Sequence, residues 1–283
     1  MMKKIAAAFL AVMMLMSCAA VAEGDWWNIL LLGTDNYEEM EEGHSRTDSM
    51  IILSVNTETN QAKMTSLMRD TWVKIDGHGH GKLNAASVYG GPELTMKTIN
   101  DHFGTDLEDY VLINISSLAD VIDTLGGIDI EITEAERQSI NRGLFDFSSQ
   151  SGMEKVESAG YVHLNGNQAV AYSRIRFIDS DYRRTERQRD VLTIMASKLK
   201  ENTNPAALVS LITDLLPNVE TNLSFTDLVS LAMTGLQLDL SGVEQFRVPV
   251  DGTFDSGTFN GTWCIKPNFE KNAAKLREFI YGE

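Results

Sequence analysis

Half of the arginines of this chain lie in one short stretch that leads into a helix, and this feature constrains the fold more than any other. The sequence has twelve arginines, and six of them fall between Tyr172 and Asp190: Arg174, Arg176, Arg183, Arg184, Arg187 and Arg189. The chain as a whole is acidic, with a formal net charge of -16. Arginines at a helix start, where unpaired amides already carry partial positive charge, are unfavourable unless an anion lies opposite. The stretch therefore predicts an anion-binding site.

The helix that follows the arginine cluster has one apolar face. Its apolar residues recur at helical spacing, at Val191, Leu192, Met195 and Leu199. Arg184 and Gln188 continue this stripe toward the start of the helix, so we expect both to point into a buried groove. Guanidinium groups bind phosphate oxygens in pairs and stay charged, which favours a pyrophosphate or a phosphodiester. The alternative is a solvated, salt-bridged helix face, because four acidic residues are interleaved: Asp179, Asp181, Glu186 and Asp190.

The first 22 residues have the composition of a targeting segment. Two lysines precede an uncharged run from Ile5 to Ala22. Three outcomes are open: cleavage after Ala22, lipidation at Cys18, or, ranked behind these, retention as a transmembrane anchor. All three export the rest of the chain, so we expect an extracytoplasmic protein at a membrane surface. Cys264 then has no partner and is expected to be a single buried thiol.

Strand-like and helix-like segments alternate along the remaining chain, which is typical of an α/β fold. About 260 residues follow the targeting segment, enough for one large domain with a full core. No linker, low-complexity tract or internal repeat divides them. The acidic balance argues against nucleic-acid binding, which needs an extended basic face.

Three buried strands are expected near the start of this domain, at 28–32, 49–56 and 62–68. If they form an antiparallel meander, the end of the first, the start of the second and the end of the third meet at one sheet edge. Asp35, Asp48 and Arg69 occupy these places, so we expect them to converge. Two carboxylates on such loops suit Mg²⁺ or Mn²⁺ better than zinc, and the sequence does not decide between the two ions. The alternative is ordinary turn and cap chemistry.

Two further loops are expected near this site. The glycine-rich segment 76–82 ends in Lys82, a mobile cation that can close on a phosphate. His78 and His80 lie within it, but no third ligand follows at an ordinary spacing, so a zinc site is not expected. Residues 133–160 are polar and poor in apolar periodicity, which predicts a long excursion such as a flap over the site.

Seven blocks of sequence between residues 30 and 192 together resemble the LytR-CpsA-Psr family. They are LLLGTD, RTDSMIILSVN, MTSLMRDTWV, KLNAASVYGG, INISSLADVIDTLGGIDI, HLNGNQAVAYSRIR and DYRRTERQRDVL, in the order of the family. Such an ordered set is far more specific than a single motif. Two positions depart from the family pattern: Met68 stands where proline is usual, and Arg183 where a small residue is frequent. Neither change removes a predicted ligand.

The resemblance implies a three-layer α/β/α domain with a central mixed, partly antiparallel sheet. Residues 26–200 would form the catalytic core, and residues 201–283 would add helices and strands to the same domain. The apolar groove would hold the polyprenyl tail of a lipid-linked pyrophosphate. The resemblance assigns metal binding to Asp35 and Asp48, and contacts with the pyrophosphate to Arg46, Arg69, Arg174, Arg176, Arg184 and Gln188. Asp181 and Arg187 fall in the same motif.

Members of this family look like cell-wall ligases. The function implied is a Mg²⁺-assisted phosphotransferase that moves a glycopolymer from an undecaprenyl-pyrophosphate carrier to peptidoglycan and leaves a phosphodiester bond. We expect four residues to take part in catalysis: Asp48, Arg69, Arg176 and Asp181. Lys82 and Arg187 would add to the pyrophosphate contacts, and either Asp48 or Asp181 could accept the proton of the attacking hydroxyl. The alternatives are a polyprenyl-pyrophosphate phosphatase or pyrophosphatase and a non-catalytic, lipid-binding regulatory module of the cell envelope.

Overall fold

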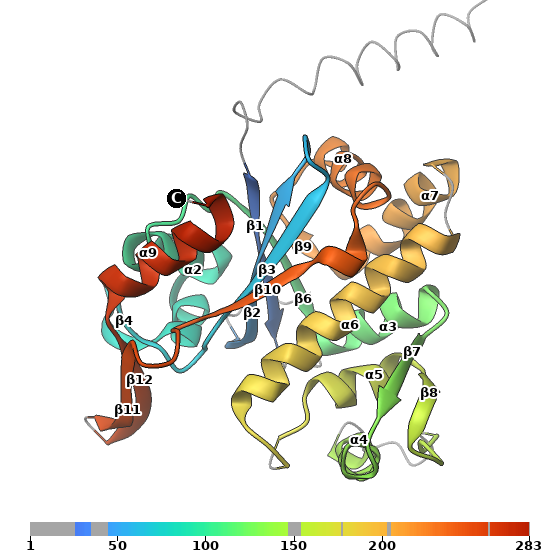
Figure 1. Ribbon diagram of the computed structural model, residues 1–283, viewed down its shortest axis with the longest axis horizontal. Helices are drawn as coiled ribbons and strands as arrows, with labels where there is room; N and C mark the ends of the chain where they lie inside the picture. Colours follow the sequence, from blue (N-terminus) through green and yellow to red (C-terminus); the bar gives the residue numbers. More distant parts are fainter. Residues whose placement is uncertain are drawn as a thin grey trace, which may run out of the picture.

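The fold is built on a six-stranded mixed sheet with the strand order β10-β3-β2-β1-β6-β9 (Figure 1). The computed structural model describes residues 26–34, 45–146, 154–176, 178–202, 205–259 and 261–282. The sheet strands are β1 (Trp26–Thr34), β2 (Thr47–Asn56), β3 (Gln61–Leu67), β6 (Asp109–Asn114), β9 (Glu220–Thr221) and β10 (Glu244–Val248). The first three form the expected antiparallel meander, while β6 runs parallel to β1 and β10 parallel to β3.

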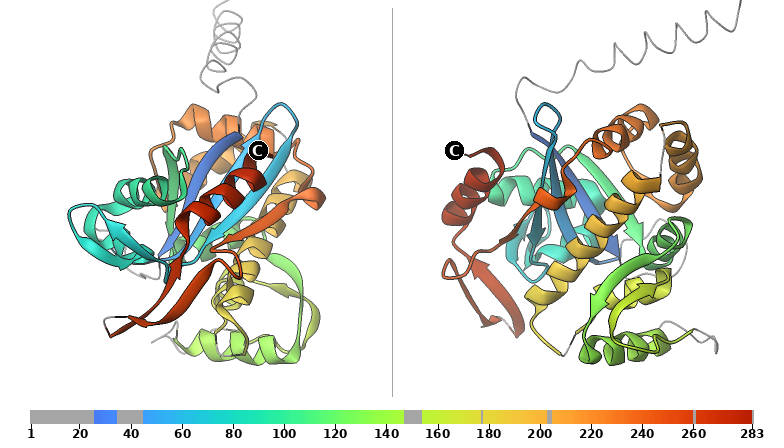
Figure 2. Two further views of the ribbon diagram at one scale, coloured as in Figure 1. Left: turned by 60° about the vertical axis from the view of Figure 1, so that its left-hand side comes forward. Right: turned by 45° about the vertical axis from the view of Figure 1, so that its right-hand side comes forward.

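Helices cover both faces of this sheet, which confirms the three-layer α/β/α arrangement. Helices α2 and α9 lie on one side, and α3, α5 and α6 on the other (Figures 1 and 2). The helices are α2 (Ala86–Phe103), α3 (Ile115–Thr124), α4 (Glu134–Asp146), α5 (Gly166–Ser173), α6 (Asp181–Asn202), α7 (Pro205–Leu215), α8 (Phe225–Gly235) and α9 (Phe269–Tyr281), with short 3-10 turns η1 (Leu83–Ala85), η2 (Leu216–Asn218) and η3 (Leu240–Gly242).

The two faces of the sheet are packed differently. Side chains alternate along a strand, so Leu30 and Leu32 of β1 join a buried cluster with α2 and α9, whereas Leu31 between them points to the other face. The second large cluster lies among α3, α4, α5, α6 and the β7–β8 hairpin, and it contains none of the central strands. Space for a cavity therefore remains between this second cluster and the sheet.

Helix α5 is fixed against α3 by a close backbone approach. A Cβ at Gly166 would lie 2.0 Å from the carbonyl oxygen of Ala119, so only glycine fits at the start of α5. Asn165 caps this helix in a box with Gln168. The cap of α3 is Asn114, whose side-chain oxygen accepts from the amide of Ser117 at 2.8 Å. These contacts hold the end of α5, where Arg174 lies, over the sheet.

Over residues 134–146 the expected flap is instead helix α4, and residues 147–153 of the same segment lie outside the described part. Ile140 and Leu144 lie one turn apart on this helix and are buried in the second cluster. Thr133 and Glu136 form a capping box at its start, with the Thr133 amide donating to Glu136 Oε2 at 2.9 Å. The Thr-x-x-Glu spacing indicates the start of a helix. Hydrophobic periodicity did not predict this helix, because its buried apolar face consists of two residues, Ile140 and Leu144.

The remaining hairpins and the C-terminal elements complete the fold. The hairpins are β4 (Trp72–Ile75) with β5 (Gly79–Lys82), β7 (Ile128–Ile132) with β8 (Gly160–Leu164), and β11 (Phe254–Phe259) with β12 (Thr262–Pro267). The last hairpin contains Cys264, which is a buried free thiol as the sequence predicted. No helix among the described residues combines the length and the apolar character that a bilayer crossing requires. Residues 1–22 with Cys18 lie outside the described part.

Candidate active site

A cavity of about 260 Å³ lies between the sheet and helices α3, α5 and α6. Most of its wall is apolar, and the sheet contributes the residues that alternate with the core, such as Ile51 and Val111. The helices contribute the opposite wall. The apolar lining includes Leu31, Ile51, Val111, Ile113, Leu118, Val121, Val170, Val191, Leu192, Met195, Leu215 and Val219. The polar lining includes Asp48, Ser49, Arg174, Arg176, Arg184 and Gln188.

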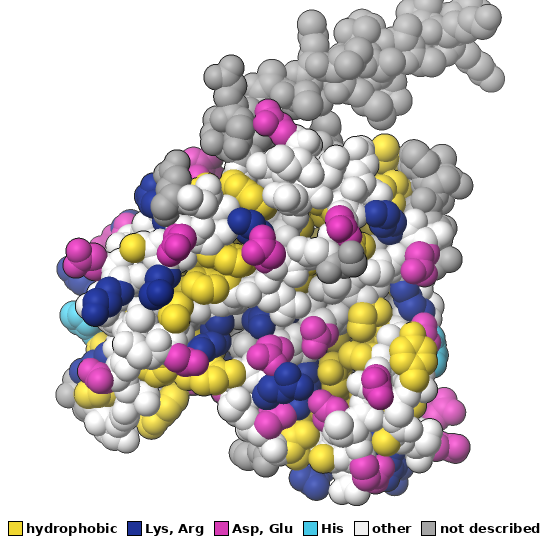
Figure 3. Space-filling view, viewed as in Figure 1, with side chains coloured by type: hydrophobic (Ala, Val, Ile, Leu, Met, Phe, Trp, Pro, Cys, Tyr) yellow, Lys and Arg dark blue, Asp and Glu magenta, His cyan; other side chains and the backbone are white. Residues whose placement is uncertain are grey.

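The polar residues of the cavity gather where β2 begins and β3 ends. Nη1 of Arg69, just after β3, lies 2.6 Å from Oδ2 of Asp48 in β2, as the meander predicts. Nη2 of Arg176 donates to the same oxygen at 2.9 Å. Figure 3 shows a notch in the molecular surface with Lys and Arg side chains at its inner end. Residues far apart in the sequence therefore form one polar mouth on an apolar cavity.

Asp48 is held ionised at this mouth. Burial alone raises the pKa of its carboxyl group, but the charge and the hydrogen bond of Arg69, followed by the charge of Arg176, outweigh burial and hold the pKa below its usual value. Among the described residues, its second oxygen, Oδ1, accepts one long hydrogen bond of 3.3 Å, from Asn84 Nδ2. Asp48 thus keeps a charged oxygen with capacity for another ligand.

Arg184 carries a buried charge that its surroundings compensate only in part. The residue is 2% exposed, and its Nη2 donates to Asp181 Oδ2 at 3.1 Å. Its Nε lies 3.0 Å from Asp181 Oδ1 but is not aligned for a hydrogen bond, and Nε of Arg69 also lacks a hydrogen-bond partner among the described residues. Burial, followed by repulsion from Arg69, lowers the pKa of Arg184 to about 10. Among the described residues, the guanidinium groups of Arg69, Arg176 and Arg184 share the carboxylates of Asp48, Asp70 and Asp181 at this mouth. The Nε donors of Arg69 and Arg184 are left without a hydrogen bond, which favours an anion nearby.

We expect Arg184→Met to stabilise the free protein. Because the folded-state pKa of Arg184 is lowered, its charge costs stability at neutral pH, and this cost declines as the pH rises through about 10. Asp181 remains partly exposed at a helix start, so it tolerates the loss of its partner. The free energy of unfolding in urea at pH 7 should rise by about 1–2 kcal/mol.

The control for this change is Arg187→Met, on the same helix and equally buried at 2% exposure. Arg187 is fully paired with Glu136 and Asp179, so its loss should lower the free energy of unfolding by about 3 kcal/mol. If both changes lowered the free energy of unfolding equally, the claim that the charge of Arg184 is uncompensated would be wrong.

Comparison with known proteins decides the family. The LytR_cpsA_psr family model matches residues 12–278. This chain belongs to the LytR_cpsA_psr family. The family expected from the seven sequence blocks is thereby confirmed, although not all of its predicted pyrophosphate contacts line the cavity.

Relatives and solved structures agree with this assignment. The chain is 31% identical over 210 residues to "Polyisoprenyl-teichoic acid--peptidoglycan teichoic acid transferase TagU" of Enterococcus faecalis, which covers 73% of the chain and 65% of TagU. The chain thus spans slightly less than two thirds of that relative. The structure of protein gbs0355 from Streptococcus agalactiae has a TM-score of 0.77 at 27% identity and covers 92% of this chain and 88% of that one. The LytR-CPS2A-psr family protein YwtF (TagT), with bound octaprenyl pyrophosphate lipid, has a TM-score of 0.67 at 26% identity and covers 90% of each chain.

Two predicted anion ligands, Lys82 and Arg187, are paired with acidic residues outside the cavity wall. Lys82 ends strand β5 of a regular hairpin and is not on a mobile loop, because its Nζ lies 2.6 Å from Asp70 Oδ1. Arg187 lies outside the cavity wall, in a buried ion pair with Glu136 and Asp179. Each side chain already has an acidic partner. The sequence could not reveal the Arg187–Glu136 and Lys82–Asp70 pairs, because both depend on the tertiary fold.

The other predicted residues are placed as follows. Arg174 lines the cavity at the end of α5. Gln188 accepts a hydrogen bond of 3.1 Å from Ser49, a cavity residue that the sequence analysis missed. Arg46 is exposed just before β2 and does not line the cavity. Asp35 lies outside the described residues, so its expected approach to Asp48 stays a prediction.

A metal ion fits the donor chemistry of Asp48. No group of three or more His, Cys, Asp or Glu side chains within the described ranges could hold a metal by itself. Mg²⁺, however, is commonly bound by one or two carboxylates together with phosphate oxygens and water. Asp48 supplies one ionised carboxylate with an oxygen in reserve, so the residue present fits such an ion.

Proposed function

We propose that this protein is a phosphotransferase that moves a glycopolymer from a polyprenyl-pyrophosphate carrier to peptidoglycan. The observation that carries this proposal is the position of Arg174, Arg176 and Arg184 at one end of an otherwise apolar cavity, with Arg69 paired to the same Asp48 as Arg176. Such a site suits a pyrophosphate with a long apolar tail. The names of TagU and of the lipid-bound YwtF support the same substrate class.

The chemistry assigns a role to each side chain at the mouth. An acceptor hydroxyl attacks the phosphorus that bears the sugar, the bond from that phosphorus to the bridging oxygen breaks, and polyprenyl phosphate leaves. Arg69, Arg176 and Arg184 hold fixed positive charge where the leaving group gains negative charge. The lowered pKa of Asp48 makes it a weak base, which favours Asp181 as the acceptor of the hydroxyl proton.

A divalent cation belongs to this proposal. Asp48 and, from the sequence, Asp35 would hold Mg²⁺ or Mn²⁺, which neutralises charge on phosphate oxygens when bound. We expect chelation of divalent ions to abolish transfer, and added Mg²⁺ to restore it. Prenyl-pyrophosphate affinity measured in parallel should fall much less, because the arginines remain. Full transfer activity in excess chelator would contradict a role for the metal.

The transfer assay uses a labelled polyprenyl-pyrophosphate-linked glycopolymer and purified peptidoglycan. We expect label to enter the peptidoglycan fraction and polyprenyl phosphate to appear in equal amount. Release of phosphate without peptidoglycan would support a phosphatase or pyrophosphatase instead. Binding of the lipid without turnover in the presence of Mg²⁺ would support the non-catalytic alternative.

The proposal places the protein outside the cytoplasmic membrane, where carrier and peptidoglycan meet. Its targeting segment agrees with export, by cleavage after Ala22, lipidation at Cys18 or a retained anchor. Mass spectrometry of the protein extracted from cells distinguishes these three forms, because each leaves a different N-terminus.

A further inference from the structure

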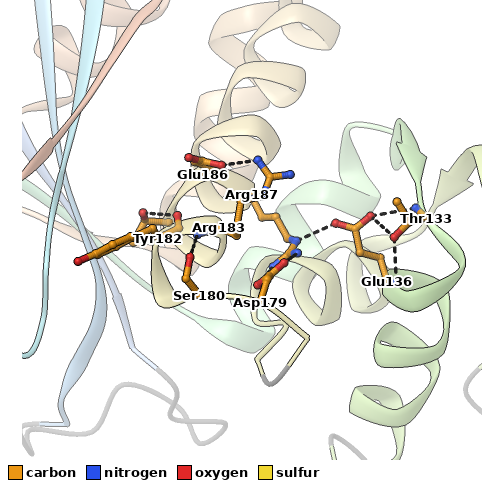
Figure 4. A network of polar contacts seen from close by, with 9 residues as sticks. Thr133, Glu136, Asp179, Ser180, Tyr182, Arg183, Glu186 and Arg187 are labelled. Atoms are coloured by element: carbon orange, nitrogen blue, oxygen red, sulfur yellow. Dashed lines mark hydrogen bonds and ion pairs between the residues drawn. The ribbon is translucent and has the colours of Figure 1, made fainter. Parts of the chain in front are cut away.

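One arginine of the cluster is held between two carboxylates from separate segments. Arg187 is 2% exposed, and its Nε donates to Glu136 Oε1 at 3.0 Å. Its Nη1 donates to Asp179 Oδ1 at 3.3 Å, and its Nη2 pairs with Asp179 Oδ2 (Figure 4). Glu136 comes from the first turn of α4, and Asp179 from the turn before α6. We call Glu136, Asp179 and Arg187 the clamp.

The α4 side of the clamp is rigid. Glu136 is 7% exposed, and its Oε2 accepts from both the amide and the hydroxyl of Thr133 at 2.9 Å. The carboxylate therefore serves two purposes, because one oxygen caps α4 and the other holds Arg187 (Figure 4). Ile140 anchors the same helix in the core. A buried charge pair with this many aligned partners has little freedom to move.

The other side of the clamp is the turn at residues 178–180, which is not packed in the core. Ile178, Asp179 and Ser180 are all exposed. This turn lies between Arg176, which donates to Asp48 at 2.9 Å, and Asp181, whose Oδ1 lies 3.0 Å from Arg184 Nε. The orientation of the turn therefore decides where Arg176 and Asp181 point. Ser180 accepts from the amide of Arg183 and so joins the turn to the start of α6, while Asp179 joins it to α4 through Arg187.

We propose that Glu136 and Asp179, acting through Arg187, are positioning residues that fix the turn between Arg176 and Asp181 for reaction at the pyrophosphate. This inference rests on the proposed function. The clamp touches no substrate and lies outside the cavity wall. Its effect is to keep one catalytic arginine and one catalytic aspartate in register with Asp48, where displacement by about 1 Å costs on the order of 10²-fold in rate.

The test replaces one clamp carboxylate at a time, as Glu136→Gln and Asp179→Asn. Glutamine still accepts from Thr133, so α4 keeps its cap. We expect kcat for transfer to fall by on the order of 10- to 100-fold in both variants, with KM for the lipid-linked donor changed by less than about 3-fold. The matched control is Glu134→Gln on the same helix, which removes an exposed ion pair with Arg137 and should leave kcat unchanged.

A double variant separates positioning from loss of stability. In an Arg176→Lys background, adding Asp179→Asn should lower kcat by clearly less than it does in wild type, because one of the two residues that the turn positions is already impaired. A purely structural role would instead give the full loss in both backgrounds and a matching drop in the urea midpoint.

Two outcomes overturn the clamp. They are kcat values for Glu136→Gln and Asp179→Asn equal to that of Glu134→Gln, and full additivity with Arg176→Lys. If either single variant fails to fold, the other still decides. Failure of the proposed function has a different signature, since wild type itself would then transfer no label to peptidoglycan. A wild type that transfers label, with clamp variants equal to the control, rejects the clamp alone.

Discussion

Replacing Arg176 with glutamine is expected to lower the rate of transfer by on the order of 10³-fold, the effect of losing an arginine that stabilises charge in phosphoryl transfer. Arg176 is partly exposed and its one described ion pair is with Asp48, so the fold should tolerate the change. Arg176→Lys should recover only a small part of the rate, because lysine keeps the charge but not the planar pair of donors. The measurement is kcat at saturating donor.

The control is Arg137→Gln, which removes a half-buried arginine of α4 that is paired with the exposed Glu134 and lies outside the cavity. It should leave kcat within about 2-fold of wild type. Near-normal kcat in Arg176→Lys would contradict bidentate recognition of the pyrophosphate.

Filling the apolar end of the cavity is expected to weaken binding of prenyl pyrophosphates by on the order of 10²-fold. Leu192 on α6 and Leu215 on α7 both line this end. Tryptophan at either position would fill space that the prenyl tail of the ligand is expected to occupy. Burial of each methylene contributes about 0.8 kcal/mol, so losing contact with four carbons costs about 3 kcal/mol. Isothermal titration with geranylgeranyl pyrophosphate measures the effect.

Inorganic pyrophosphate is the internal control for these variants, because it uses only the polar mouth. Its affinity should stay within about 2-fold of wild type in Leu192→Trp and Leu215→Trp. Val209→Trp, at a partly exposed position of α7, controls for the bulk of tryptophan. Unchanged affinity for the prenyl ligand would mean that the tail binds elsewhere.

Local pattern was enough to predict the central architecture. The alternation of apolar residues in β1, β2 and β3, with a short polar turn after Asn56, predicted the meander and therefore the approach of Asp48 to Arg69. The helical stripe through Arg184 and Gln188 likewise predicted that both face a groove. These features follow from the side-chain periods of two residues in a strand and 3.6 residues in a helix, which can be read from the sequence itself.

Partner choice among charged residues could not be predicted in the same way. Arg184 and Arg187 lie on one helix and are equally buried, yet one faces the cavity and the other is neutralised by Glu136. The difference depends on where α4 packs, and α4 was not predicted because only two apolar residues mark its buried face. Lys82 was misplaced for a similar reason, since glycines suggested a mobile loop where a β-hairpin pairs it with Asp70.

Competitive affinity measurement with three ligands tests the central claim most directly. The claim is that one cavity binds a pyrophosphate at its arginine mouth and a prenyl tail along its apolar wall. Octaprenyl pyrophosphate should then bind at least 100-fold more tightly than either octaprenol or inorganic pyrophosphate alone. Equal affinity for octaprenol and octaprenyl pyrophosphate would mean that the arginines contribute nothing to lipid binding, and the account would be wrong.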